Sequence, residues 1–98
     1  MNRFDLDAQN ALPFVYHEPA AGADGKTLVF INPITGDMGL WNEQIVPAMQ
    51  AKGYGTLVYN FRGQANAPYG ADQHLTDELI IGDLQALLKH VSAPNPVL

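Results

Sequence analysis

Two short apolar segments, residues 27–31 and 56–61, restrict the fold more than any other feature of the chain. Neither segment alternates polar and apolar residues, which is typical of strands covered on both faces, as in parallel α/β sheets. Each segment is followed by a loop and then by a stretch with helical spacing. This order predicts a parallel α/β sheet, in which the chemistry lies at the carboxyl ends of the strands.

The two helical stretches have recognisable ends. Four apolar residues and a lysine recur at helical spacing, namely Trp41, Ile45, Ala48, Met49 and Lys52. Gly53 follows where a left-handed residue commonly ends a helix. Thr76 and the two carboxylates after it are typical of a helix amino terminus. An apolar stripe then runs along residues 79–88, which predicts a helix with one buried face.

The first residues of the chain predict a β-hairpin. Phe4, Leu6 and Ala8 alternate with polar residues, which indicates a half-buried strand. Residues 10–13 are expected to turn the chain, and residues 14–17 to form a second, antiparallel strand. A surface loop is expected over residues 19–25. A further strand is expected to begin at residues 96–98, the last residues of the sequence.

Composition excludes several classes of function. A hydrophobic share of 47% and a charged share of 15% predict a folded chain. The net charge of -5 disfavours nucleic acids and anionic membranes, and the five Lys and Arg residues are scattered. Without cysteine, a secretory signal or a long apolar run, the expected location is cytoplasmic.

No cofactor or metal is expected from the motifs. The loop after Ile31 holds one glycine, Gly36, where a dinucleotide fingerprint needs three. Gly25-Lys26-Thr27 is like the end of a phosphate-binding loop, but it precedes a strand instead of a helix. The histidines have no zinc-ligand spacing and are expected to be structural or solvated; they are His17, His74 and His90.

The segment Asn32-Pro33-Ile34 is the sharpest candidate site. It follows a buried strand, where a backbone N–H can point at a developing oxyanion. Pro33 has no N–H, but it can direct the loop so that the N–H of Ile34 faces a pocket. The alternative, equally weighted, is a plain turn with Ile34 in the core. Trp41 is expected in the core or a pocket wall.

Arg62 admits two interpretations. Its guanidinium could bind a substrate carboxylate. The favoured interpretation is internal hydrogen bonding to carbonyls or to a carboxylate in nearby loops, because the group has five donors to satisfy. Asn32, Trp41 and Arg62 are therefore candidate residues that line a pocket or support a loop.

Taken together, residues 28–36, Trp41, residues 53–63 and residues 76–88 resemble the amino-terminal part of the α/β-hydrolase fold. In that family a strand ends in His-Gly-x, and the backbone N–H of x contributes to the oxyanion hole. A later strand ends in Asp-x-Arg-Gly-His-Gly, and the strand after the next helix leads to a Gly-x-Ser-x-Gly nucleophile elbow. Ile34 matches the oxyanion-hole donor.

The chain departs from the family pattern at five positions. Asn32-Pro33 stands where His-Gly is usual, Asn60 replaces the aspartate, and Gln64-Ala65 replaces the second His-Gly. Substitution of the first His-Gly pair occurs in lactonase-like and other branches, so the resemblance in fold persists.

The resemblance implies an incomplete domain. Residues 1–98 would form the amino-terminal part of a single α/β-hydrolase domain, a β-hairpin followed by parallel βαβαβ units and truncated before the nucleophile elbow. No catalytic residue can be assigned, because the nucleophile is expected just after Leu98, with the acid and the histidine later. The parent protein would hydrolyse a small ester, lactone or related bond by a Ser-His-Asp mechanism, and the fragment itself would be inert.

Other interpretations stay open. The chain could be a complete small α/β binding or interaction module without catalysis. It could also belong to a hydrolase-fold protein that has lost catalysis, or use a nucleophile other than serine. A fragment would leave an apolar sheet edge open, which predicts self-association through that edge. The only expected ligand of the parent protein is a small ester-like substrate.

Overall fold

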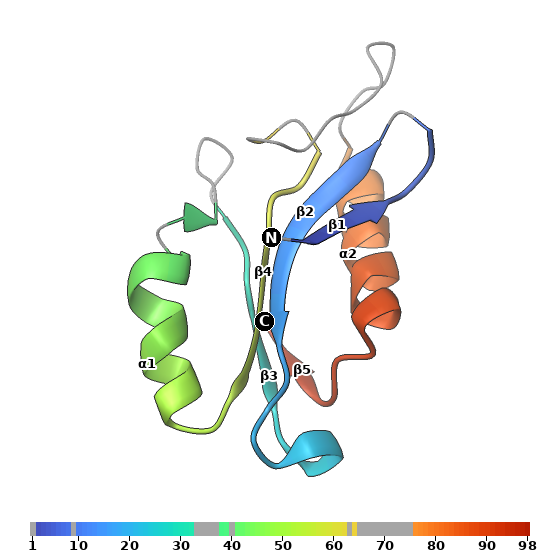
Figure 1. The fold of residues 1–98 in the computed structure, drawn as a ribbon. Helices are drawn as coiled ribbons and strands as arrows, with labels where there is room; N and C mark the ends of the chain where they lie inside the picture. Colours follow the sequence, from blue (N-terminus) through green and yellow to red (C-terminus); the bar gives the residue numbers. More distant parts are fainter. Residues whose placement is uncertain (1, 9, 33–37, 40, 63, 65–75) are drawn as a thin grey trace.

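The computed structural model describes residues 2–8, 10–32, 38–39, 41–62, 64 and 76–98. It contains a five-stranded mixed sheet with the order β1-β2-β4-β3-β5. Its strands are β1 (Asn2–Asp5), β2 (Ala11–His17), β3 (Thr27–Phe30), β4 (Gly55–Tyr59) and β5 (Pro96–Val97). Figure 1 shows helix α1 (Val46–Ala51) on one face of this sheet and helix α2 (Asp77–Val91) on the other.

The sheet combines the predicted hairpin with the predicted parallel strands. β1 and β2 pair antiparallel, and β3 pairs parallel with both β4 and β5. β2 also pairs antiparallel with β4, with Phe14 opposite Tyr59, so the hairpin extends the parallel sheet. The carboxyl ends of β3 and β4 therefore lie together at one edge, beside the start of α2 (Figure 1).

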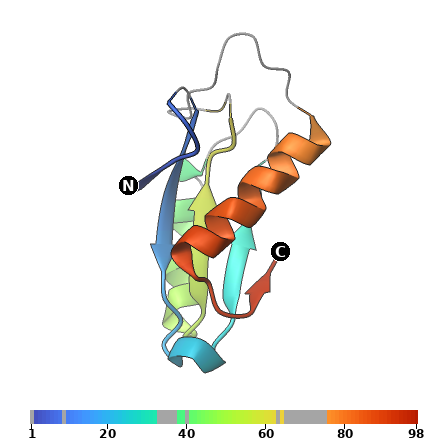
Figure 2. The ribbon, with the colours of Figure 1, turned by 90° about the vertical axis from the view of Figure 1, so that its right-hand side faces the viewer.

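Each face of the sheet carries its own apolar cluster. Residues 57 and 59 of β4 face α2, and residue 58 faces α1, as the twofold alternation of a strand requires. The larger cluster, under α2, consists of Leu12, Phe14, Val29, Leu57, Tyr59, Phe61 and Leu87. Helix α2 crosses this face diagonally (Figure 2). The smaller cluster, under α1, contains Met38, Val46 and Val58.

Both predicted helix ends are confirmed. Gly53 has a φ of 87°, its N–H donates to Gln50 O, and the N–H of Tyr54 donates to Met49 O. These two bonds satisfy carbonyls at the end of α1 in the way of a Schellman motif. At α2, the Thr76 hydroxyl accepts a hydrogen bond from the N–H of Leu79 at 3.2 Å.

The hairpin turn lies earlier than predicted. β1 ends at Asp5, so the predicted strand continuing to Ala8 is wrong, and residues 11–13 belong to β2. The Asp7 carboxylate accepts hydrogen bonds from the backbone and side chain of Asn10, which stabilises the connection between β1 and β2. Pro13 lies within the strand, opposite Arg3.

The first helix is shorter than predicted. Residues 41–45 form a π-helical turn, η2 (Trp41–Ile45), and α-helical geometry begins only at Val46. Pro47 lies in the first turn of α1, where its missing N–H is tolerated, so the regular helix starts there and not at Trp41.

The segment predicted to be buried throughout, 27–31, is not buried at its end. Val29 is buried, whereas Ile31 is 42% exposed. β5 pairs with β3 only at Thr27 and Leu28, so within the described chain no strand lies beside Ile31 on that side.

Candidate functional site

Polar side chains that are almost fully buried gather where β3 and β4 end. Asn32 follows β3 closely, and Asn60 follows β4 directly. These two asparagines, Arg62 and Gln64 are each exposed by less than 10%. Because β3 and β4 are parallel neighbours, their carboxyl ends bring these side chains to the same edge, where α/β proteins place their sites.

Asn32 is the centre of this cluster. Its Nδ2 lies 2.8 Å from Tyr59 O, 2.9 Å from Asn60 Oδ1 and 3.1 Å from Gln64 Oε1. Its Oδ1 accepts a hydrogen bond of 2.7 Å from the indole Nε1–H of Trp41. An indole can only donate, so this contact fixes the orientation of the Asn32 amide.

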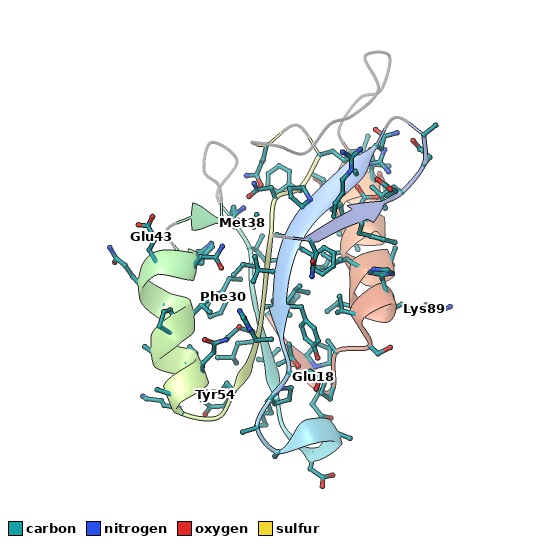
Figure 3. The ribbon with its side chains drawn as sticks, viewed as in Figure 1. Glu18, Phe30, Met38, Glu43, Tyr54 and Lys89 are labelled. Atoms are coloured by element: carbon teal, nitrogen blue, oxygen red, sulfur yellow. The ribbon has the colours of Figure 1, made fainter. Side chains whose placement is uncertain are left out.

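Asn32, Asn60 and Gln64 form an amide cluster, and two further hydrogen bonds connect it to the backbone. Asn60 Oδ1 accepts a hydrogen bond from the N–H of Met38 at 2.8 Å. Gln64 Oε1 accepts one from the N–H of Phe61 at 3.0 Å. Figure 3 shows Met38 at the end of the sheet where β3 and β4 finish, on the side of α1. The cluster therefore connects Asn32, which follows β3, to Met38 and to the residues that follow β4.

A second, charged contact lies on the other face of the same edge. The Arg62 guanidinium donates to Asp83 of α2, with Nε 2.6 Å from Oδ2 and Nη2 2.9 Å from Oδ1. The prediction that Arg62 makes an internal contact with a carboxylate is confirmed. This carboxylate lies on a helix, because the second turn of α2 brings Asp83 close to the residues that follow β4.

Burial changes the electrostatics beside this ion pair. The Tyr59 side chain is 1% exposed, and burial, followed by the charge of Asp83, raises the pKa of its phenol to about 12. A phenolate next to a carboxylate in an apolar core is unfavourable, so Tyr59 stays neutral to a higher pH than an exposed tyrosine would.

The predicted site residues have different outcomes. The structure brings Asn32 and Trp41 into direct contact, and the Trp41 ring stacks on Phe30 with centroids 5.2 Å apart. Arg62 lies at the same edge but contacts Asp83. Ile34, the predicted oxyanion-hole donor, lies outside the described residues, so its role stays a prediction.

Sequence reasoning missed three contributors to the site, Asn60, Gln64 and Asp83. Asn60 and Gln64 were visible only as departures from a motif, and Asp83 only as a polar residue within the apolar stripe of a helix. A carboxylate on the buried face of a helix needs a buried partner. This requirement is the signal from which the pairing of Asp83 with Arg62 could have been predicted.

The histidines and the single serine lie away from this edge or outside the described chain. His17 ends β2, as expected, and is exposed. His90 lies in the last turn of α2 and stacks on Phe4 with ring centroids 4.4 Å apart. Ser92 caps the carboxyl end of α2, the end remote from the candidate site (Figure 1). His74 lies outside the described residues.

The described residues hold neither a metal-binding group nor a membrane span. Within them, no three His, Asp or Glu side chains gather as metal ligands would. None of the helices in this part of the chain is both long and apolar enough to cross a bilayer.

Comparison with known proteins identifies the fold. No protein-family model matches the chain, and no curated protein is significantly similar in sequence. A solved carboxylesterase structure from the ammonia-oxidizing thaumarchaeon Nitrososphaera gargenis is similar, with a TM-score of 0.75 and 24% sequence identity. The match covers 91% of this chain and 31% of that chain. The chain therefore has the fold of part of a carboxylesterase, an α/β-hydrolase-like arrangement.

Proposed function

We propose that this chain is the amino-terminal portion of an α/β-hydrolase whose complete domain hydrolyses a small carboxylic ester, lactone or related bond. The observation that carries the proposal is the fold shared with a carboxylesterase over 91% of the chain. The chain spans 31% of that enzyme's length, so most of such a domain would be contributed by sequence outside residues 1–98.

In this proposal the chain contributes the oxyanion-hole side of the site. A serine outside the chain attacks the carbonyl carbon, a histidine takes the proton of the serine, and an acid orients the histidine. The backbone N–H of Ile34 donates a hydrogen bond to the oxyanion that forms. The amide cluster supports this role, because it anchors Asn32 and Met38, which flank residues 33–37.

By the same proposal, residues 1–98 are inert alone. The only serine of the chain, Ser92, caps α2 with a φ of 55° and is exposed, and no described histidine is its hydrogen-bond partner. A serine with no base to accept its proton is a weak nucleophile. The complete protein is proposed to act in the cytoplasm on a small-molecule substrate, without a cofactor.

A fluorophosphonate probe tests both parts of the proposal. The 98-residue chain should not be labelled, and a chain extended by its native downstream sequence should be labelled at one serine and hydrolyse p-nitrophenyl acetate. Labelling of the short chain would contradict the assignment of the nucleophile to sequence outside it. An extended chain that resists the probe and hydrolyses no ester or lactone would contradict the proposed activity.

Self-association of the 98-residue chain through β5 is part of the same proposal. β5 is at the edge of the described sheet, and its end is apolar and accessible, with Val97 44% and Leu98 78% exposed. An exposed apolar edge strand is a template for pairing with another chain.

A further inference from the structure

One side-chain oxygen connects the two ends of the segment 33–37. Asn60 Oδ1 accepts a hydrogen bond from Asn32 Nδ2 at 2.9 Å and from the backbone N–H of Met38 at 2.8 Å. Asn32 immediately precedes this segment and Met38 immediately follows it. Both flanking residues are thus tied to the same atom.

The backbone of the residue that carries this oxygen is held by the sheet. Asn60 follows β4 directly, and its backbone N–H donates to Pro13 O of β2 at 3.1 Å. The side chain is 2% exposed, so water does not compete for its hydrogen bonds. The neighbouring Tyr59 O accepts from the same Asn32 amide, at 2.8 Å.

We infer that Asn60 is a positioning residue, which fixes the separation of Asn32 and Met38 and thereby the start and end of the segment carrying Ile34. The inference rests on the proposed function in so far as Ile34 is the oxyanion-hole donor. In this inference Asn60 acts through the two residues that it holds, Asn32 and Met38. Its essential group is the acceptor oxygen, because both partners are N–H donors.

Two substitutions of nearly the same size as asparagine distinguish the role of the acceptor oxygen from the role of side-chain volume. Asn60→Leu keeps the size but removes the acceptor, which leaves the buried N–H of Met38 without this partner. Asn60→Asp keeps an oxygen for both donors. Asn2→Leu is the matched control, because Asn2 is exposed on β1, which pairs with β2 and not with β4.

Amide hydrogen exchange of the 98-residue chain, measured by NMR, tests the inference. In Asn60→Leu the Met38 amide should exchange about tenfold faster relative to the amides of β4, as expected for one lost buried hydrogen bond. In Asn60→Asp and in Asn2→Leu the ratio should stay within about twofold of wild type. An unchanged ratio in Asn60→Leu would overturn the inference, as would the same loss in Asn60→Asp.

A kinetic readout keeps this inference distinct from the proposed function. If the extended chain is an esterase, Asn60→Leu should lower kcat by about tenfold with little change in KM, and Asn60→Asp should restore most of the rate. If the exchange result holds but the extended chain is not labelled by fluorophosphonate, the proposed function fails and the anchoring by Asn60 stands. If labelling succeeds without the exchange effect, only the inference about Asn60 fails.

Discussion

Arg62 and Asp83 form a buried, bidentate ion pair that joins the end of β4 to helix α2. The two hydrogen bonds measure 2.6 Å and 2.9 Å, and the side chains of both residues are 7% exposed. The pair spans 21 residues of sequence, including the segment 65–75. It therefore fixes the carboxyl edge of the sheet against the helix that covers it.

Removing one partner of this pair should destabilise the chain strongly. Asp83→Leu leaves the Arg62 guanidinium buried without its carboxylate, which typically costs about 3–5 kcal/mol. The double variant Arg62→Met, Asp83→Leu should regain a large part of this loss, because neither charge remains buried. Urea unfolding measures both. A single variant within about 1 kcal/mol of wild type would show that the pair is energetically unimportant.

Asn32→Asp should make stability depend on pH. The introduced carboxyl would place an oxygen against Tyr59 O, Asn60 Oδ1 and Gln64 Oε1, all acceptors within 3.1 Å of the present Nδ2. Only the protonated form can donate, so the pKa of this carboxyl is raised above its unfolded value. Stability relative to wild type should then fall as pH rises through the folded-state pKa.

Unfolding of Asn32→Asp at mildly acidic and at neutral pH checks this sign. The variant should lose more stability at neutral pH, whereas Asn42→Asp, a half-buried residue of η2 outside the amide cluster, should not show the same trend. A deficit that does not change with pH would contradict the orientation of the Asn32 amide that the Trp41 indole imposes.

The Tyr59 phenol should make the chain sensitive to alkali. Its pKa is raised from 10.0 to about 12, so the stabilisation is fully present below pH 10 and is lost as pH rises toward 12. By pH 12 the loss from Tyr59 should be about 2 kcal/mol. Burial also raises the pKa of Tyr16, so Tyr59→Phe should reduce the slope without abolishing it. Urea unfolding across this pH range, with tyrosinate absorbance, measures the effect.

Gly55→Ala and Gly82→Ala should have opposite effects. A Cβ on Gly55 would lie 2.8 Å from Pro19 N and 2.9 Å from His17 O, so backbone atoms must move, at a cost of about 1–3 kcal/mol. A Cβ on Gly82 meets nothing within 4 Å, and alanine should stabilise α2 by about 0.5–1 kcal/mol. Thermal unfolding distinguishes them, and equal effects would contradict the close approach at Gly55.

Val97→Lys should reduce self-association of the 98-residue chain. A lysine on an edge strand disfavours pairing with another chain. Ile81→Lys is the matched control, because Ile81 is 56% exposed on α2 and not on a strand. Sedimentation analysis should show a smaller associated fraction for the β5 variant only. If the wild type is monodisperse and melts cooperatively as a monomer, the binding-module interpretation gains support instead.

Local sequence signals predicted the ends of the helices well, because these ends depend on residues that are close together in the chain. Thr76 and Gly53 mark helix ends because a hydroxyl cap and a left-handed residue are local requirements. The first α-helix is shorter than its apolar spacing predicts, because proline is tolerated only in the first turn of a helix. Pro47 therefore places the start of α1 at Val46. Asp7 moves the hairpin turn by a side-chain contact that the alternation of Phe4, Leu6 and Ala8 does not reveal.

The candidate site could be predicted in part. Its place at the carboxyl ends of two parallel strands followed from the element order, and Asn32, Trp41 and Arg62 were identified individually. An internal carboxylate partner was predicted for Arg62, but the contacts of Asn32 and Trp41 were not predicted. The three polar departures from the hydrolase pattern, Asn32, Asn60 and Gln64, proved to be hydrogen-bonded neighbours, although 28 residues of sequence separate the first two.

The sequence by itself determined the strands, the helices, the hairpin and the resemblance to a hydrolase scaffold, because propensity, capping and apolar periodicity act between residues near in the chain. Only the tertiary structure decided which polar groups meet. Strand order brought Asn60 beside Asn32 and Met38, and the packing of α2 brought Asp83 to Arg62. A buried polar group must find a partner, but its identity depends on which distant segments the sheet places side by side.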